Sequence, residues 1–127
     1  MNSNFLDFFF VLLYHYAMTN IMNQKQSKSL FSAFLQLKTN EEVGKFCRDL
    51  MTESEIQEFA SRWQVAQELD SGLPQRQVSK KTGTSIATVT RVNQWLKRGM
   101  GGYKLVLSRL SKIDHHRPRS VGLHPEI

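Results

Sequence analysis

Residues 73–97 read LPQRQVSKKTGTSIATVTRVNQWLK, and this pattern predicts two short helices separated by a glycine turn. Pro74 suits the start of the first helix, because its fixed φ fits the first turn and its missing N–H is not needed there. Gly83 supplies the positive φ that a tight turn between helices requires. Thr84 or Ser85 can cap the second helix through its hydroxyl. The stretch 74–98 is therefore interpreted as a helix-turn-helix.

The second helix of this motif has an apolar side and a side of small polar residues. Val89 and Leu96 are the expected anchors in the core. Ile86 and either Val92 or Asn93 fall at the same helical intervals. The residues left for solvent or a ligand are Ala87, Thr88, Thr90, Arg91 and Gln94.

Charge is distributed unevenly along the chain, whose net charge is +6. Residues 39–70 hold eight acidic side chains (Glu41, Glu42, Asp49, Glu53, Glu55, Glu58, Glu68, Asp70) and three basic ones (Lys45, Arg48, Arg62). Residues 71–113 hold no acidic side chain and nine basic ones (Arg76, Lys80, Lys81, Arg91, Lys97, Arg98, Lys104, Arg109, Lys112). Ordinary surfaces mix the two signs, so this segment predicts a polyanionic partner, with nucleic acid as the leading candidate.

The side chains of the motif suit the major groove of double-stranded DNA. Small residues at the tip of the second helix allow its backbone to approach the bases, where hydroxyls can hydrogen-bond and methyl groups can contact thymine. Arg76 can bind a guanine through two hydrogen bonds. Phosphates are the expected partners of Lys80, Lys81, Lys97 and Arg98. The alternative is an ordinary helical hairpin with a basic face.

The remaining sequence predicts an all-α fold in one domain with a reducing, cytoplasmic setting. Apolar residues at three- and four-residue intervals predict a helix over 28–38, and Asn40 is expected to cap the next one. Thr52 and Glu55 form a capping-box pair that opens a longer helix. A final helix is expected to end near Ile113. The single Cys47 excludes an internal disulfide and is expected to be a core thiol.

The N-terminal segment 1–25 does not match the rest of the chain. Its apolar run, residues 5–18, is shorter than the roughly 20 residues of a membrane span and contains Asp7, so stable membrane insertion is not expected. A positive leader typical of a secretory signal is missing. We interpret the segment as upstream sequence included through a mis-assigned start, with Met18 or Met22 as the beginning. The alternative is an apolar helix that packs in a dimer or touches a membrane surface.

The C-terminal residues 114–127 contain two prolines and no periodicity, which predicts a disordered tail after a domain spanning 26–113. His115, His116 and His124 lie there without a second ligand cluster at fixed spacing, so no metal site and no cofactor are expected. An enzyme is not expected either, because no nucleophile–base pattern, phosphate-binding loop or carboxylate pair stands in a recognisable frame.

Residues 28–112 resemble the Trp repressor superfamily. Gln75-Arg76, Gly83 and the run Ile86-Ala87-Thr88-Val89-Thr90-Arg91 nearly reproduce its helix-turn-helix. Arg62-Trp63, Arg91-Val92-Asn93 and Gly101-Gly102-Tyr103-Lys104 are more similar to the YerC/YecD branch of TrpR-like regulators. The resemblance implies an intertwined all-helical homodimer whose two heads read successive major grooves of a palindromic operator as a transcriptional regulator, expected to be a repressor. It also implies an operator-contacting set of Arg76, Ile86, Ala87, Thr90 and Lys97, with Thr88 among them. Lys80 and Arg91 complete the predicted DNA-binding residues, as basic side chains of the same two helices.

The resemblance further implies a ligand slot, which this sequence alters. In the family an indole ring lies between two arginines, and Arg62 and Arg91 stand at the matching positions. The glycine and serine that complete that slot are replaced by Val92 and Trp95. Because both replacements are larger, we expect DNA binding that does not depend on free tryptophan. A different function, a protein-interaction module that no longer reads DNA, stays as the alternative.

Overall fold

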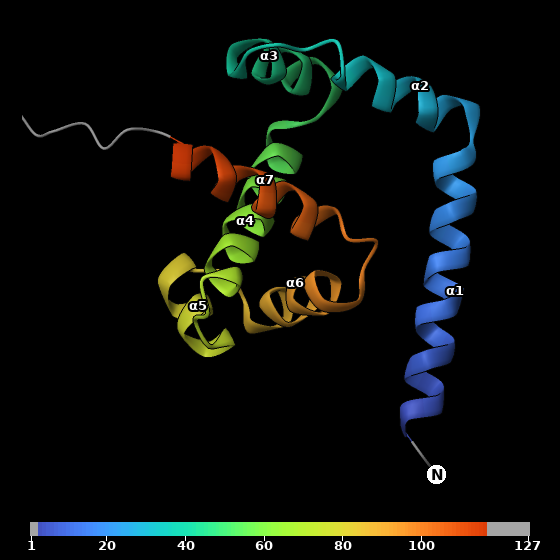
Figure 1. The fold of residues 1–127 in the computed structure, drawn as a ribbon, viewed down its shortest axis with the longest axis vertical. Coiled ribbons are helices and arrows are strands. Elements are labelled where there is room, and N and C mark those ends of the chain that lie inside the picture. The colour runs from blue at the N-terminus through green and yellow to red at the C-terminus, as the bar shows by residue number, and fades with distance from the viewer. Residues whose placement is uncertain (1–2, 117–127) are drawn as a thin grey trace, which may run out of the picture.

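The computed structural model describes residues 3–116, and within them every regular element is a helix, as the sequence predicts. The helices are α1 (Ser3–Asn23), α2 (Lys25–Phe34), α3 (Asn40–Leu50), α4 (Glu53–Asp70), α5 (Gln75–Thr82), α6 (Ile86–Arg98) and α7 (Gly102–His116). In Figure 1, α4 runs through the middle of the bundle, α5 and α6 lie at one end of it, and α7 crosses it. The all-α prediction is confirmed.

The buried core lies where α4, α5 and α6 meet. Its fully buried side chains come from all three helices: Val65 and Ala66 from α4, Val78 from α5, and Val89 and Val92 from α6. Leu96 is nearly as buried, so both expected anchors of α6, Val89 and Leu96, are confirmed. Around this core pack the half-buried side chains of Trp63, Leu69, Leu73 and Tyr103. The core therefore belongs to the helix-turn-helix and the one helix that supports it.

Side-chain caps fix the start of α4. The Glu55 amide donates to the Thr52 hydroxyl oxygen at 3.2 Å, and the Thr52 amide donates to the Glu55 carboxylate at 2.8 Å. This capping box confirms the predicted pair and satisfies two amides that the helix itself leaves unpaired. The same backbone hydrogen bond from Thr52 lowers the pKa of Glu55, because it favours the charged carboxylate.

Several predicted helix boundaries were wrong. Thr39, not Asn40, caps α3, since Thr39 is extended and accepts a hydrogen bond from the Glu42 amide at 3.2 Å, whereas Asn40 is already helical. The helix expected over 28–38 spans 25–34 instead. The final helix continues past Ile113 to His116, so the first residues of the predicted tail are helical. The rest of that tail, including His124, lies outside the described residues.

Within the N-terminal segment, residues 3–23 form one continuous helix, α1, that stands along one side of the bundle (Figure 1). The helix is longer than the apolar run seen in the sequence, and residues 4–23 are long and apolar enough to cross a membrane by length and composition. Such a helix close to an N-terminus is weak grounds for a membrane span, because signal sequences and core helices share these properties. Most of its large apolar side chains are exposed.

The turn after α5 depends on Gly83, which has φ of 69° as the sequence predicts. A side chain at this position would strain the left-handed backbone. Gly83→Ala should therefore lower the free energy of unfolding by about 1–2 kcal/mol, measured by urea denaturation. Gly44→Ala is the control, because a Cβ there meets nothing within 4 Å and should be neutral or stabilise by up to about 1 kcal/mol. Equal effects at both glycines would contradict this account of the turn.

Candidate nucleic-acid interface

Three side-chain hydrogen bonds lie at the turn between α5 and α6. The Ser79 hydroxyl donates to the Thr84 carbonyl at 2.7 Å, and the Thr82 hydroxyl donates to the Val78 carbonyl at 2.8 Å. The Thr84 amide in turn donates to the Thr82 hydroxyl oxygen at 3.3 Å. These bonds engage the amide and carbonyl of Thr84 in the connection and the Val78 carbonyl of α5.

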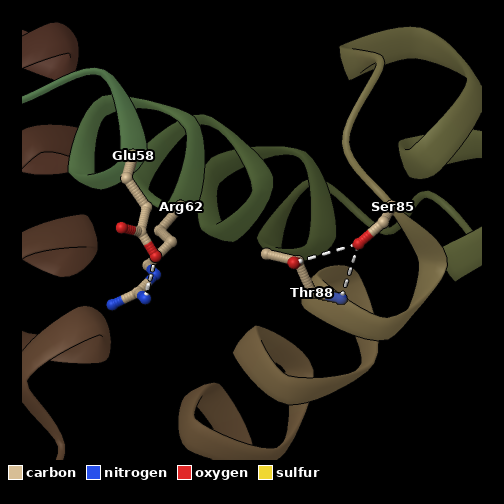
Figure 2. A network of polar contacts seen from close by, with 4 residues as sticks. All are labelled: Glu58, Arg62, Ser85 and Thr88. Atoms are coloured by element: carbon tan, nitrogen blue, oxygen red, sulfur yellow. Dashed lines mark hydrogen bonds and ion pairs between the residues drawn. The ribbon is translucent and has the colours of Figure 1, made fainter. Parts of the chain in front are cut away.

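The N-terminus of α6 is capped by Ser85, which selects one of the two predicted caps. The Thr88 amide donates to the Ser85 hydroxyl oxygen at 3.2 Å, and the Ser85 hydroxyl donates to the Thr88 hydroxyl oxygen at 3.1 Å. Figure 2 shows these two contacts at the start of α6. Thr88 is half-buried and partly engaged within its own helix.

The other predicted contact residues lie on the surface of α5 and α6. Ile86, Ala87, Thr90 and Arg91 are exposed on the first two turns of α6. Arg76 and Lys80 are exposed on α5, and Lys97 is exposed in the last turn of α6. The structure thus presents all of them to solvent on the two helices of the motif, apart from the half-buried Thr88.

Gln75 has a structural role that sequence reasoning missed. The Thr90 hydroxyl donates to the Gln75 side-chain oxygen at 2.9 Å, joining the start of α5 to the second turn of α6. This bond orients the Thr90 hydroxyl on the exposed side of α6, the recognition helix of the motif. The fifteen residues that separate the two in sequence left no periodic signal for this pair.

The cations of the motif are mostly free of carboxylate partners. Within residues 3–116, no ion pair involves Arg76, Lys80, Arg91 or Lys97. Lys81 differs, because it pairs with Glu68 of α4 at 2.8 Å. Lys81, which the sequence predicts to contact phosphates, therefore also has a structural role, because its ion pair joins α5 to α4. Uncompensated cations on one segment give a positive surface that attracts polyanions.

The residues of the predicted ligand slot take up different environments. Arg62 of α4 pairs with Glu58, as Figure 2 shows, and its guanidinium lies 6.0 Å from the centroid of the Trp95 ring. Val92 is fully buried in the core, whereas Arg91 is exposed. The Trp95 indole therefore lies beside Arg62, one of the two arginines of the predicted slot.

An apolar cavity of about 500 Å³ lies next to Trp95, at the corner between α6 and α7. Its lining includes Trp63, Trp95 and Tyr103, and Tyr14 of α1 lies at it as well. The rings of Trp63 and Tyr103 stack with centroids 6.3 Å apart. Burial raises the pKa of Tyr103, because the neutral phenol is favoured away from water. Sequence reasoning did not find this cavity, since its aromatic residues come from four separate segments.

A capped helix-turn-helix with an exposed, positively charged recognition helix defines a DNA-binding regulatory protein. Comparisons with known proteins agree with this class. Residues 25–111 match the family described as Trp repressor protein. Protein YerC of Bacillus subtilis is 37% identical over 90 residues, spanning 71% of this chain and 86% of YerC.

Two further relatives extend the comparison. A Trp operon repressor homolog of Chlamydia trachomatis is 37% identical over 79 residues, spanning 58% of this chain and 84% of that protein. The crystal structure of a TrpR-like protein from Eubacterium eligens superposes with a TM-score of 0.69 at 36% identity, covering 72% of this chain and 95% of that one. The chain belongs to the Trp repressor family and is similar to its YerC-like branch.

The hydrogen bond between Gln75 and Thr90 can be tested by its contribution to stability. Gln75→Ala should lower the free energy of unfolding by about 1 kcal/mol, because one side-chain hydrogen bond between α5 and α6 is lost. Gln77→Ala is the matched control, since this exposed glutamine of the same helix has no such bond. Urea denaturation of both variants measures the difference. Equal stability of the two would show that the bond contributes nothing in solution.

Proposed function

We propose that the protein is a transcriptional repressor that binds a palindromic operator as a homodimer in the cytoplasm. The observation that carries the proposal is the exposed surface of α5 and α6. Short side chains lie there together with Arg76, Lys80, Arg91 and Lys97, which form no ion pair within residues 3–116. Such a surface combines groups for base edges with groups for phosphates. Neither catalysis nor stable membrane insertion is part of the proposed function.

The proposed contacts divide by chemistry. Arg76 and Thr90 are assigned to base edges, because a guanidinium can bind guanine bidentately and a hydroxyl can bond to several bases. Ile86 and Ala87 are assigned to thymine methyl groups at the tip of α6. The phosphate contacts are assigned to Lys80, Arg91 and Lys97. Thr88 is grouped with Ile86 and Ala87, because it lies on the same first turn of α6.

The homodimer is supported by apolar side chains that the single chain leaves uncovered. Phe31, Phe59, Leu105 and Leu110 are exposed on α2, α4 and α7. Soluble chains rarely leave so many large apolar side chains exposed to water. A second copy packed on these helices would cover them and place two recognition helices on one DNA molecule, as in paired half-sites one helical turn apart.

Two substitutions separate specific from nonspecific contacts. Arg76→Ala should reduce discrimination against wrong bases by about 1–3 kcal/mol at one position, whereas Lys97→Ala should weaken all DNA alike and lower the salt slope by about 1. Affinities for a selected fragment and for random DNA, measured by fluorescence anisotropy across salt concentrations, test both. Lys45→Ala on α3, outside the motif, is the control. Wild-type behaviour of both motif variants would refute the assignment.

Independence from free tryptophan is proposed because Trp95 already lies beside Arg62 and Val92 is fully buried. Saturating L-tryptophan should change operator affinity by less than about twofold, which corresponds to a negligible coupling free energy. The measurement is the same binding assay with and without the amino acid. A clear gain in affinity that is lost in Arg62→Ala would show that the slot still accepts an indole ligand.

The alternative function is a protein-interaction module whose helix-turn-helix does not read DNA. The exposed apolar side chains of α1 are the observation that favours it. Absence of any salt-sensitive DNA binding by the intact protein would support this alternative and contradict the repressor.

A further inference from the structure

The α1 helix, which lies outside the part of the chain that matches the Trp repressor family, has two different faces. Its half-buried residues are Val11, Tyr14, His15 and Met18, at spacings of three, one and three residues. These spacings place them on one side of a helix. This inner face meets the rest of the protein, where His15 Nε2 donates to the Gly99 carbonyl at 3.3 Å and Tyr14 lies at the aromatic cavity.

The opposite side of α1 is an uncovered apolar seam, which we define as Phe5, Phe9, Leu12 and Tyr16. All four are at least half exposed, from 50% at Leu12 to 76% at Tyr16. Their spacings of four, three and four residues repeat every seven, which is the pattern of a helix that packs against another helix in a coiled coil. The seam therefore fits a helical partner.

We infer that this seam pairs with the same seam of a second copy of the chain. The four residues carry no charge, so two identical seams meet without like-charge repulsion, as a two-fold symmetric contact requires. A fully exposed large side chain has about 200 Å² of surface. Scaled by their exposed fractions, the four seam residues and the neighbouring Leu13, which is 47% exposed, offer roughly 600 Å² a copy. Two copies then bury about 1,200 Å², which lies in the range of specific interfaces.

The inner face argues against a lipid bilayer as the occupant of the seam. Insertion of α1 across a membrane would break the contact between His15 and Gly99 and carry Asp7 into hydrocarbon. Asp7 instead lies near Arg98 at the end of α6, where both line the same shallow cavity. Pairing of the seams leaves these inner contacts in place. The inference does not depend on DNA reading, because it concerns a helix outside the motif.

Site-specific disulfide formation in the full-length protein tests the pairing. Cys47 is the only cysteine, so Cys47→Ser gives a background without thiols. In that background, Leu12→Cys alone should cross-link if the seams run parallel, and a mixture of Phe9→Cys and Leu12→Cys proteins should cross-link if they run antiparallel. The expected result is cross-linking at least about tenfold faster than for Phe10→Cys in one of these two arrangements.

Phe10→Cys is the matched control, because Phe10 is 67% exposed on the same helix but lies off the seam. Cross-linking at all positions at the rate of this control would overturn the pairing. Binding of the wild-type protein to phosphatidylcholine vesicles, with no position-dependent cross-linking, would also overturn it and assign the seam to lipid. Operator binding measured on the same samples reports separately on the proposed repressor function.

Discussion

The contact among α4, α5 and α6 is the constraint on which the rest of the structure depends. Val65 and Ala66 of α4 meet Val78 of α5 and Val89 of α6 with no exposed surface on any of them. These four small or β-branched side chains are closely packed, and a close-packed interior has few voids into which side chains could move. The three helices therefore have little freedom to slide past one another. The orientation of the recognition helix is thus set by the packing behind it, while its exposed side contributes the Ser85 cap and the Thr90–Gln75 hydrogen bond.

Hydrogen bonds and one ion pair add to the packing of α4, α5 and α6. These hydrogen bonds lie in α5, in α6 and in the turn that joins them. They are the cap from the Ser85 hydroxyl, the bonds around Thr84 and the bond between Thr90 and Gln75. The ion pair between Lys81 and Glu68 adds a tie between α5 and α4 on the surface. The segment without acidic residues is therefore stabilised by a carboxylate from α4, whereas Arg76, Lys80, Arg91 and Lys97 form no ion pair within residues 3–116.

The sequence predicted the local chemistry well and the long-range contacts poorly. Gly83, the Thr52–Glu55 capping box and the anchors Val89 and Leu96 were all confirmed, because each follows from periodicity or from one residue's backbone preference. The cap of α3 was misplaced by one residue, since Thr39 and Asn40 have similar capping chemistry and only backbone geometry separates them.

The candidate site was predictable only in part for the same reason. Exposed residues of α5 and α6 could be named from the motif, and the structure places them on its surface, but their contacts with DNA stay predictions. The Thr90–Gln75 bond, the contact between His15 and Gly99 and the aromatic cavity join residues distant in sequence. No pattern in a single sequence encodes such pairings, because they arise from how whole helices are placed.

The two tryptophans of the chain, Trp63 and Trp95, both line the cavity between α4, α6 and α7. One indole stacks on Tyr103 and the other lies beside the Arg62 guanidinium. The tryptophan fluorescence of the protein therefore originates at the corner where the recognition helix ends. A tilt of that helix would change the environment of both indole rings, so tryptophan fluorescence would report the orientation of the recognition helix.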